Sequence, residues 1–171
     1  LPDGRRQITG FADAGQCLGL STAQTYSFGA ETVDNVRLCR FLRPQLEALL
    51  SDYPTFERRL LAAVTDKLAE AQEQMLLLGR KTAREKVATF LLDRMRAFHQ
   101  TANRRQEAEN MASVPMTRVD IADYLGLTIE TVSRTISAFR RSMLIASAEN
   151  HRIRILSVAT LLNIASGQKA D

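Results

Sequence analysis

The sequence predicts an α+β protein in three parts: the tail of a β-rich domain, one long helix and a winged helix-turn-helix domain. Three observations indicate this. Residues 1–50 hold short apolar runs broken by turns, residues 51–79 carry apolar residues at helical spacing, and residues 80–171 contain two capped helices followed by a hairpin. With 171 residues, 45% hydrophobic and 25% charged, the chain suits one ordinary folded domain or two small ones.

The first part contains RQITGF, AGQCLGL and VRLCRF, which we expect to be short strands. They are too few to bury a core, and the chain opens on a turn signal, so it reads as a piece of a longer protein. Cys17 and Cys39 lie far apart with no His near them. This pattern is neither a disulfide framework nor a metal site, and it predicts two buried free thiols.

A long helix is predicted from Pro54, with Asp52 near its start, to an end or bend at Gly79. Apolar residues alternate along it at spacings of three and four. This stripe consists of Leu61, Val64, Leu68, Ala71, Met75 and Leu78. It is either the core face of a single helix or the seam of a two-helix dimer. The charged residues on the opposite side favour the dimer.

RKTAREKVATFLLDRMRAFHQ predicts another helix, with Val87, Phe90, Leu91 and Met95 on its apolar face. Basic residues are expected on its other sides: Arg80, Lys81, Arg84, Lys86, Arg94 and Arg96. Of these, Lys81, Arg84 and Lys86 fit a solvated face or a DNA footprint equally well. The polar residues 101–114 predict a loop.

Two short helices are predicted next. Thr117 and Asp120 have the spacing of an N-cap, and the buried side of the first helix is Val119, Ile121, Ala122 and Leu125. Gly126 can take the positive φ that ends this helix, and Thr128 can cap a second helix running to about Arg141. Two helices joined by such a turn make a helix-turn-helix. LIAS and RIRIL then predict a hairpin, or wing, and Ser157 starts a last helix.

The second helix of a helix-turn-helix lies in the major groove of DNA. Its predicted base-reading residues are Ile129, Glu130, Ser133 and Arg134, opposite an apolar face of Val132, Ile136 and Phe139. An Arg can pair with guanine O6 and N7, a Glu can accept a hydrogen bond from cytosine N4, and a Ser can serve as donor or acceptor. The alternative is a Glu130–Arg134 salt bridge on a solvated helix. Candidate contacts to the DNA backbone are Thr117, Arg118, Thr128, Thr131, Arg140, Arg141, Arg152 and Arg154.

The distribution of charge supports a polyanion partner. Residues 80–171 carry 15 Lys and Arg against nine Asp and Glu, whereas residues 1–79 carry eight against ten. No nucleophile with a base partner, phosphate-cradling glycine loop or paired-carboxylate site is recognisable, so an enzyme is not expected. No apolar run is long enough to span a membrane and no signal peptide is recognisable, which predicts a cytoplasmic protein.

PDGRRQITGFADAGQCLGL, GRKTAREKVATFLL and TRVDIADYLGLTIETVSRTISAFR resemble the Crp/Fnr family of bacterial transcription regulators over essentially all 171 residues. Ser133, where the cyclic-AMP receptor branch has Gly, is similar to the Fnr and FixK branch. The resemblance implies an N-terminal β-roll of the cyclic-nucleotide-binding type, ending within residues 1–50, then a dimerisation helix and a winged helix-turn-helix. It also implies a homodimer that binds palindromic DNA with TTGAT-like half-sites and contacts RNA polymerase. Arg134 would then contact the guanine, and Glu130 the opposite cytosine or adenine edges.

Some features depart from the family. Cyclic-nucleotide binders carry Gly-Glu-Leu and then Arg-Ser, but this chain has Leu18-Gly19-Leu20 and Tyr26-Ser27-Phe28. Binding of a cyclic nucleotide is therefore not expected. Fnr proteins hold an iron-sulfur cluster through an N-terminal cysteine group and one distal cysteine; Cys39 falls a residue or two beyond the distal position. We expect no cofactor and no metal, and regulation through abundance or cysteine oxidation. The alternative is a winged-helix protein-interaction or redox-responsive module without specific DNA readout.

Overall fold

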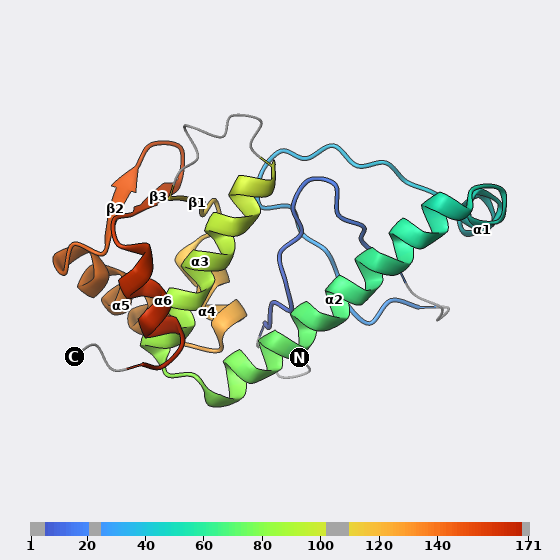
Figure 1. Ribbon diagram of the computed structural model, residues 1–171. Coiled ribbons are helices and arrows are strands. Elements are labelled where there is room, and N and C mark those ends of the chain that lie inside the picture. Colours follow the sequence, from blue (N-terminus) through green and yellow to red (C-terminus); the bar gives the residue numbers. More distant parts are fainter. Residues whose placement is uncertain (1–5, 21–24, 102–109, 169–171) are drawn as a thin grey trace. The chain divides into compact units, whose positions relative to one another are not determined.

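The computed structural model of the chain describes residues 6–20, 25–101 and 110–168. Its elements in order are α1 (Arg43–Asp52), α2 (Pro54–Arg80), α3 (Ala83–Thr101), β1 (Met111–Ser113), α4 (Arg118–Leu125), α5 (Ile129–Arg141), β2 (Ile145–Ala148), β3 (Arg152–Ile155) and α6 (Val158–Ala165) (Figure 1). They form two compact units. Residues 15–74 make one unit, and residues 1–14 together with 75–171 make the other, which we call the DNA-binding unit after its predicted role.

The strands predicted in the first part of the chain are absent: residues 6–20 and 25–42 form no strand. A strand needs a hydrogen-bonded partner strand, and no strand among the described residues pairs with these short runs. Residues 43–52 form α1 instead, with the Gln45 side chain accepting a hydrogen bond from the Leu42 N–H at its start. Cys17 and Cys39 are both exposed, so the prediction of buried thiols was wrong. Without a sheet, this segment has no core to receive them.

The long helix is confirmed as α2, which begins at the predicted Pro54 and continues through Gly79 to Arg80. Five members of the apolar stripe are exposed: Leu61, Val64, Leu68, Ala71 and Met75. They are not the core face of a single helix in this structure. Leu78 differs, because it is half-buried and packs against the core of the DNA-binding unit. No described helix, α2 included, is long and apolar enough to cross a membrane.

The core of the DNA-binding unit is built around α3, with α6 and β1 packed along it (Figure 1). Val87, Phe90 and Leu91 of α3 are fully buried, as the helical spacing predicted, and Met95 is partly buried at the edge. Each fully buried side chain of this size stabilises the fold by about 1.5–3 kcal/mol. The other elements contribute further core residues, among them Ile121, Leu125, Val132, Ile136, Phe139, Ile145, Ile153, Ile155 and Leu161.

Two basic residues of α3 that we predicted on its outer sides are buried. The Lys86 ammonium donates to the carbonyl oxygen of Leu125 at 3.1 Å. The Arg94 guanidinium donates to both carboxylate oxygens of Asp13, at 2.6 and 2.9 Å, and to the Ser113 carbonyl at 3.1 Å. Polar groups are tolerated in a core when they find such partners. Lys86 is therefore neither a solvated residue nor part of a DNA footprint, and both of its predicted roles were wrong.

The helix-turn-helix forms as its caps predict, although Val119, predicted on the buried side of α4, is 46% exposed in its first turn. The Thr117 hydroxyl accepts from the Asp120 N–H at 3.2 Å, and the Asp120 carboxylate accepts from the Thr117 N–H at 2.9 Å, which closes a capping box on α4. Gly126 ends α4 in the left-handed region at φ 60°. The Thr128 hydroxyl then accepts from the Thr131 N–H at 3.2 Å and caps α5.

The wing is part of a three-stranded antiparallel sheet in the order β1-β3-β2, with Met111 opposite Arg154 and Ile145 opposite Ile155. The hairpin of β2 and β3 and the Ser157 cap of α6 are confirmed. Strand β1 was missed, because residues 101–114 were predicted to be a loop; residues 102–109 of that prediction lie outside the described residues. Three residues are too few to show a period of two, and it is their pairing with β3 that makes them a strand.

Candidate nucleic-acid interface

Helix α5 has one buried and one exposed face, in the orientation that the sequence predicts. Val132, Ile136 and Phe139 are at most 1% exposed and pack into the core. On the opposite side Ile129, Glu130 and Arg134 are exposed and Ser133 is half-buried. The burial of one face fixes the rotation of the helix about its axis, and this presents the polar edge to solvent.

Glu130 sits in the first turn of α5. Its pKa is held below the usual value, mainly by a hydrogen bond from its own backbone N–H, then by one from the Thr128 hydroxyl, with the positive charge of Arg134 adding to the effect. These favour the charged form of the carboxyl group. An anionic carboxylate also complements the positive end of the helix dipole. Glu130 is therefore an ionised acceptor at neutral pH.

Glu130 and Arg134 do not form the salt bridge that was the alternative interpretation. Both residues are described, and no ion pair within 4.0 Å joins them. The Arg134 guanidinium instead makes a long hydrogen bond, 3.4 Å, to the Thr131 hydroxyl. Most of its five N–H donors remain available to a ligand in front of the helix.

A shallow depression runs along the side of α5 next to the start of α3. Its lining includes three arginines, Arg84, Arg134 and Arg141, and three serines, Ser133, Ser137 and Ser142. The Arg84 guanidinium lies 5.8 Å from the centre of the Phe139 ring, which holds it against α5. The sequence left open whether Arg84 is solvated or part of a DNA footprint; the structure brings it beside the predicted base-reading residues.

Ser137 was missed by the sequence prediction. A signal was present, since Ser137 lies four residues after Ser133 and so shares its side of the helix. Arg141 follows four residues later, and all three line the depression. The candidate surface therefore extends one turn further along α5 than we predicted.

A second basic feature joins the two helices of the motif. The pKa of Arg118, at the first position of α4, is lowered by partial burial and then by repulsion from Arg140 of α5. Two like charges held this close favour an anion between or beside them. Three of the predicted backbone contacts lie in this region: Arg118 and the exposed Thr117 are at the start of α4, and Arg140 in the last turn of α5 is close enough to repel Arg118.

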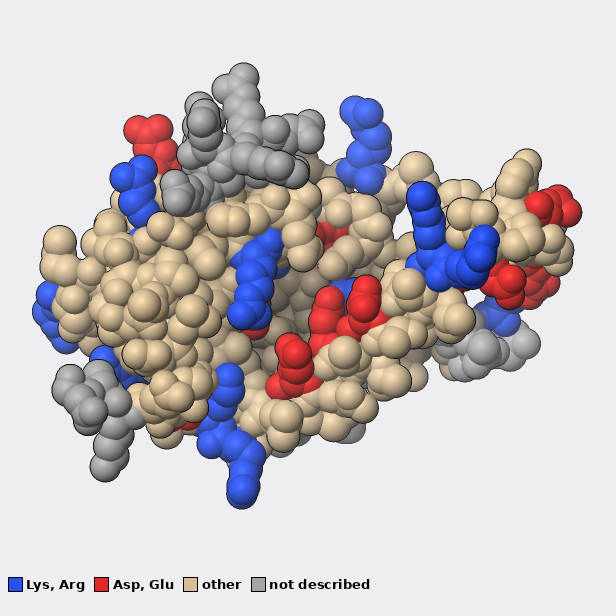
Figure 2. Space-filling view, in the orientation of Figure 1, with Lys and Arg blue, Asp and Glu red and all other residues tan. Residues whose placement is uncertain are grey.

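The remaining candidates are arranged differently. Thr128 and Thr131 share a hydroxyl-to-hydroxyl hydrogen bond of 3.0 Å at the cap of α5. Arg152 in β3 packs over the Phe98 ring at the end of α3, 5.1 Å from its centre, and does not line the depression. Arg154, two residues on, is exposed. On the face of the molecule in Figure 2, acidic side chains gather along α2, and Lys and Arg side chains lie both over the DNA-binding unit and near α1.

The sequence pattern of the Crp-like helix-turn-helix domain matches residues 85–164, which run from α3 into α6. The chain is 37% identical over all 171 residues to the transcriptional activator protein FnrL of Cereibacter sphaeroides and covers 68% of it. The chain belongs to the Crp/Fnr family. It is also 45% identical over 145 residues, 85% of its length, to the transcriptional activatory protein AadR of Rhodopseudomonas palustris, of which it covers 59%.

The Crp/Fnr fold is also found among solved structures. FixK2 from Bradyrhizobium japonicum matches 75% of this chain with a TM-score of 0.62 and 36% identity, and 60% of FixK2 is covered. The nitrogen fixation regulation protein FixK of Bradyrhizobium diazoefficiens is 41% identical over 146 residues, which are 85% of this chain and 60% of that protein. The chain thus spans about three fifths of the length of several relatives. Its predicted fold class is confirmed at this level, although the strands expected before α1 are not formed.

Proposed function

We propose that the chain is a sequence-specific DNA-binding transcription regulator that binds a palindromic site as a homodimer. One observation carries the proposal: α5 is capped, buried along one face, and presents ionised Glu130 and exposed Arg134 on the other. Family membership supports it, since FnrL and AadR are described as transcriptional activators. For the whole protein we propose contact with RNA polymerase on the same ground.

In this proposal the N-terminal half of α5 enters the major groove. The Arg134 fork pairs with guanine O6 and N7, and Glu130 accepts from cytosine N4 or adenine N6 on the opposite strand. Ser133 donates or accepts, and Ile129 contacts a thymine methyl group. The half-sites would be of the TTGAT type that the family resemblance implies.

The surrounding cations would contact phosphates, which set register and affinity without reading sequence. Arg118 and Arg140 supply one such group, and Arg141 and Arg84 in the depression supply another. The cap hydroxyls of Thr117, Thr128 and Thr131 are short-range phosphate donors. Arg152 and Arg154 are the candidates from the wing.

Dimerisation would use the exposed stripe on α2, whose spacing of three and four residues is that of a coiled-coil seam. Leu61, Val64, Leu68 and Met75 are between 45% and 67% exposed in the single chain. Pairing two such helices removes this surface from water. Related by a two-fold axis, the two α5 helices would lie about 34 Å apart, one turn of DNA.

Arg134→Ala tests direct readout. The expected cost is roughly 1–3 kcal/mol on a site selected from a random DNA pool, with loss of discrimination at one base pair. Arg96→Gln is the matched control, because it also removes one exposed cation from the same unit but lies outside the candidate surface. An equal loss for Arg134→Ala on selected and random DNA would refute readout by Arg134.

The rival function is a winged-helix protein-interaction module. The salt dependence of DNA binding distinguishes the two functions. When a protein neutralises Z phosphates, the logarithm of its affinity falls by about 0.9Z for each tenfold rise in salt concentration. We expect measurable affinity for duplex DNA with a steep slope of this kind. A docking module would show little affinity for any duplex at any salt concentration.

A further inference from the structure

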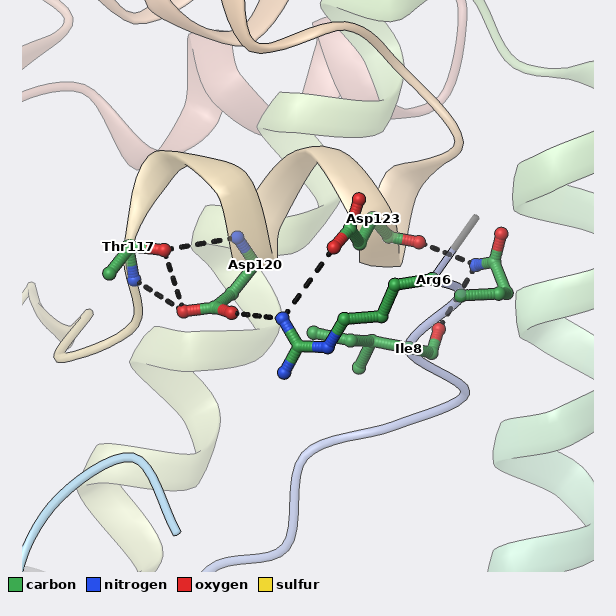
Figure 3. A network of polar contacts seen from close by, with 6 residues as sticks. Arg6, Ile8, Thr117, Asp120 and Asp123 are labelled. Atoms are coloured by element: carbon green, nitrogen blue, oxygen red, sulfur yellow. Dashed lines mark hydrogen bonds and ion pairs between the residues drawn. The ribbon is translucent and has the colours of Figure 1, made fainter. Parts of the chain in front are cut away.

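Residues 6–13, which we call the strap, lie against α4 and α3 within the DNA-binding unit. Figure 3 shows Arg6 pointing at the acidic side of α4. Its guanidinium lies 2.6 Å from a carboxylate oxygen of Asp120 and 3.5 Å from one of Asp123. The carbonyl oxygen of Asp123 accepts from the Gln7 side chain at 2.6 Å and from the Ile8 N–H at 3.4 Å. The strap thus holds α4 through both side-chain and main-chain groups.

An aromatic contact follows along the strap. The Phe11 ring centre lies 5.0 Å from that of Tyr124 in α4 and 6.2 Å from that of Phe90 in α3. Phe11 is half-buried, whereas Phe90 is at the centre of the core. Tilted aromatic rings at these distances attract one another beyond the area they bury. Phe11 therefore joins α3 and α4 at one point.

The end of the strap is anchored by Asp13. Its carboxylate makes two hydrogen bonds with the Arg94 guanidinium, and the Arg94 side chain is only 10% exposed. Arg94 also donates to the Ser113 carbonyl, which links this anchor to β1. A paired fork of this kind is strong and directional.

The strap acts on the helix that supports the candidate interface. Asp120 accepts from Arg6 with one oxygen and closes the Thr117 capping box with the other. Three residues, 126–128, separate α4 from α5, and the two helices pack together. A shift of α4 would therefore move α5.

We propose that the strap is a docking segment that positions α4, and with it α5, for DNA, and so couples residues N-terminal to α1 to the DNA-binding unit. Arg6 and Asp13 are positioning residues in this arrangement. The proposal rests on the proposed function, because it assigns a role in DNA binding to contacts away from the DNA-reading edge. When the strap is docked, affinity for DNA is highest.

Asp13→Asn gives the sharpest test, because a charge effect and a positioning effect have opposite signs. Removing a carboxylate from a DNA-binding unit should by charge alone tighten binding to a polyanion. Release of the strap should weaken it. We expect Asp13→Asn to weaken binding to a selected duplex by roughly 2- to 30-fold, the span reported for residues that couple distant sites. Unchanged or tighter binding would overturn the proposal.

Glu149→Gln is the matched control. Glu149 is exposed in the turn between β2 and β3 and away from the strap, so its neutralisation should not weaken binding. If it weakens binding as much as Asp13→Asn does, the strap has no special role. Arg6→Gln should weaken DNA binding, and Arg6→Lys should restore part of the loss. Because the Arg6 side chain is exposed, these two variants can be compared even if Asp13→Asn folds poorly.

Amide hydrogen exchange separates positioning from general loss of stability. Release of the strap in Arg6→Gln should speed exchange in α4, which the strap contacts, and leave α6, which packs on α3, unchanged. A uniform rise in all elements would contradict positioning. Failure of the proposed function would look different. If the unaltered chain binds no duplex, the proposed function is wrong. If the unaltered chain binds DNA and the Asp13→Asn variant binds it equally well, only the strap proposal is wrong.

Discussion

The ammonium of Lys86 lies 3.1 Å from the carbonyl oxygen of Leu125 and joins the first turn of α3 to the last residue of α4. The carbonyl groups at the end of a helix have no partner within that helix, and they carry the negative end of its dipole. A buried cation is therefore well placed there. This contact ties the helix-turn-helix to the central helix of the core.

Replacing Lys86 should lower the free energy of unfolding in two steps. Lys86→Met keeps the apolar stem but removes the donor, which should cost about 1–3 kcal/mol because the Leu125 carbonyl loses a hydrogen bond from a charged group. Lys86→Ala also removes the buried stem and should cost more. Urea unfolding measures both losses, and a Lys86→Met variant as stable as the original chain would contradict this role.

Gly126→Ala should destabilise the DNA-binding unit by about 1–2 kcal/mol. Gly126 has a φ of +60°, where a side chain is strained. A Cβ there would also lie 3.3 Å from the Leu78 Cδ2 atom. The matched control is Gly79→Ala in α2, where a Cβ meets nothing within 4 Å. That substitution should raise helix stability by roughly 0.5–1 kcal/mol, and thermal unfolding of both variants should show opposite shifts.

Arg84→Gln should weaken DNA binding by a similar factor on selected and random duplexes. Arg84 lies beside the predicted base-reading residues Ser133 and Arg134, where it would contact phosphate. The slope of log affinity against log salt should become shallower by about 0.9 for one lost phosphate contact. A titration over several salt concentrations measures both quantities. Arg96→Gln should leave the slope unchanged, and a loss confined to the selected site would argue for base readout by Arg84 instead.

Leu68→Glu should convert the proposed dimer to a monomer, because it places a carboxylate in the middle of the exposed stripe on α2. Sedimentation would show half the mass, and affinity for a palindromic site would fall as the two half-sites lose their linkage. Ala69→Glu is the control: Ala69 is also exposed and adjacent in sequence, but lies off the stripe. If both variants keep the dimer mass, the seam lies elsewhere.

Several local structures follow from the sequence because their causes are local. Thr117, Gly126 and Thr128 were predicted as helix boundaries, and each has the expected cap or positive φ. The two faces of α5 follow from the positions of Val132, Ile136 and Phe139, since helical periodicity separates them from Glu130 and Arg134. The wing hairpin follows from two β-prone runs around a short turn.

Other features depend on contacts between residues far apart in the chain. Strand β1 exists because β3 pairs with it, and Arg84 joins the candidate surface because α3 packs against α5. The strands expected before α1 failed for the converse reason, since no partner strand lies beside them among the described residues. The exposure of Cys17 and Cys39 follows from this failure.

From the sequence alone follow the order of the elements from α2 onward except β1, the caps of the helix-turn-helix and the side of α5 that faces outward. These depend on periodicity and on hydrogen bonds between residues within four positions of one another. Packing between distant segments buries Lys86 and Arg94, brings Arg84 beside Arg134, and sets Arg6 and Asp13 against α4 and α3. The partner of a charged residue cannot be predicted from its position in the sequence, because packing across the whole unit determines which distant residue lies beside it.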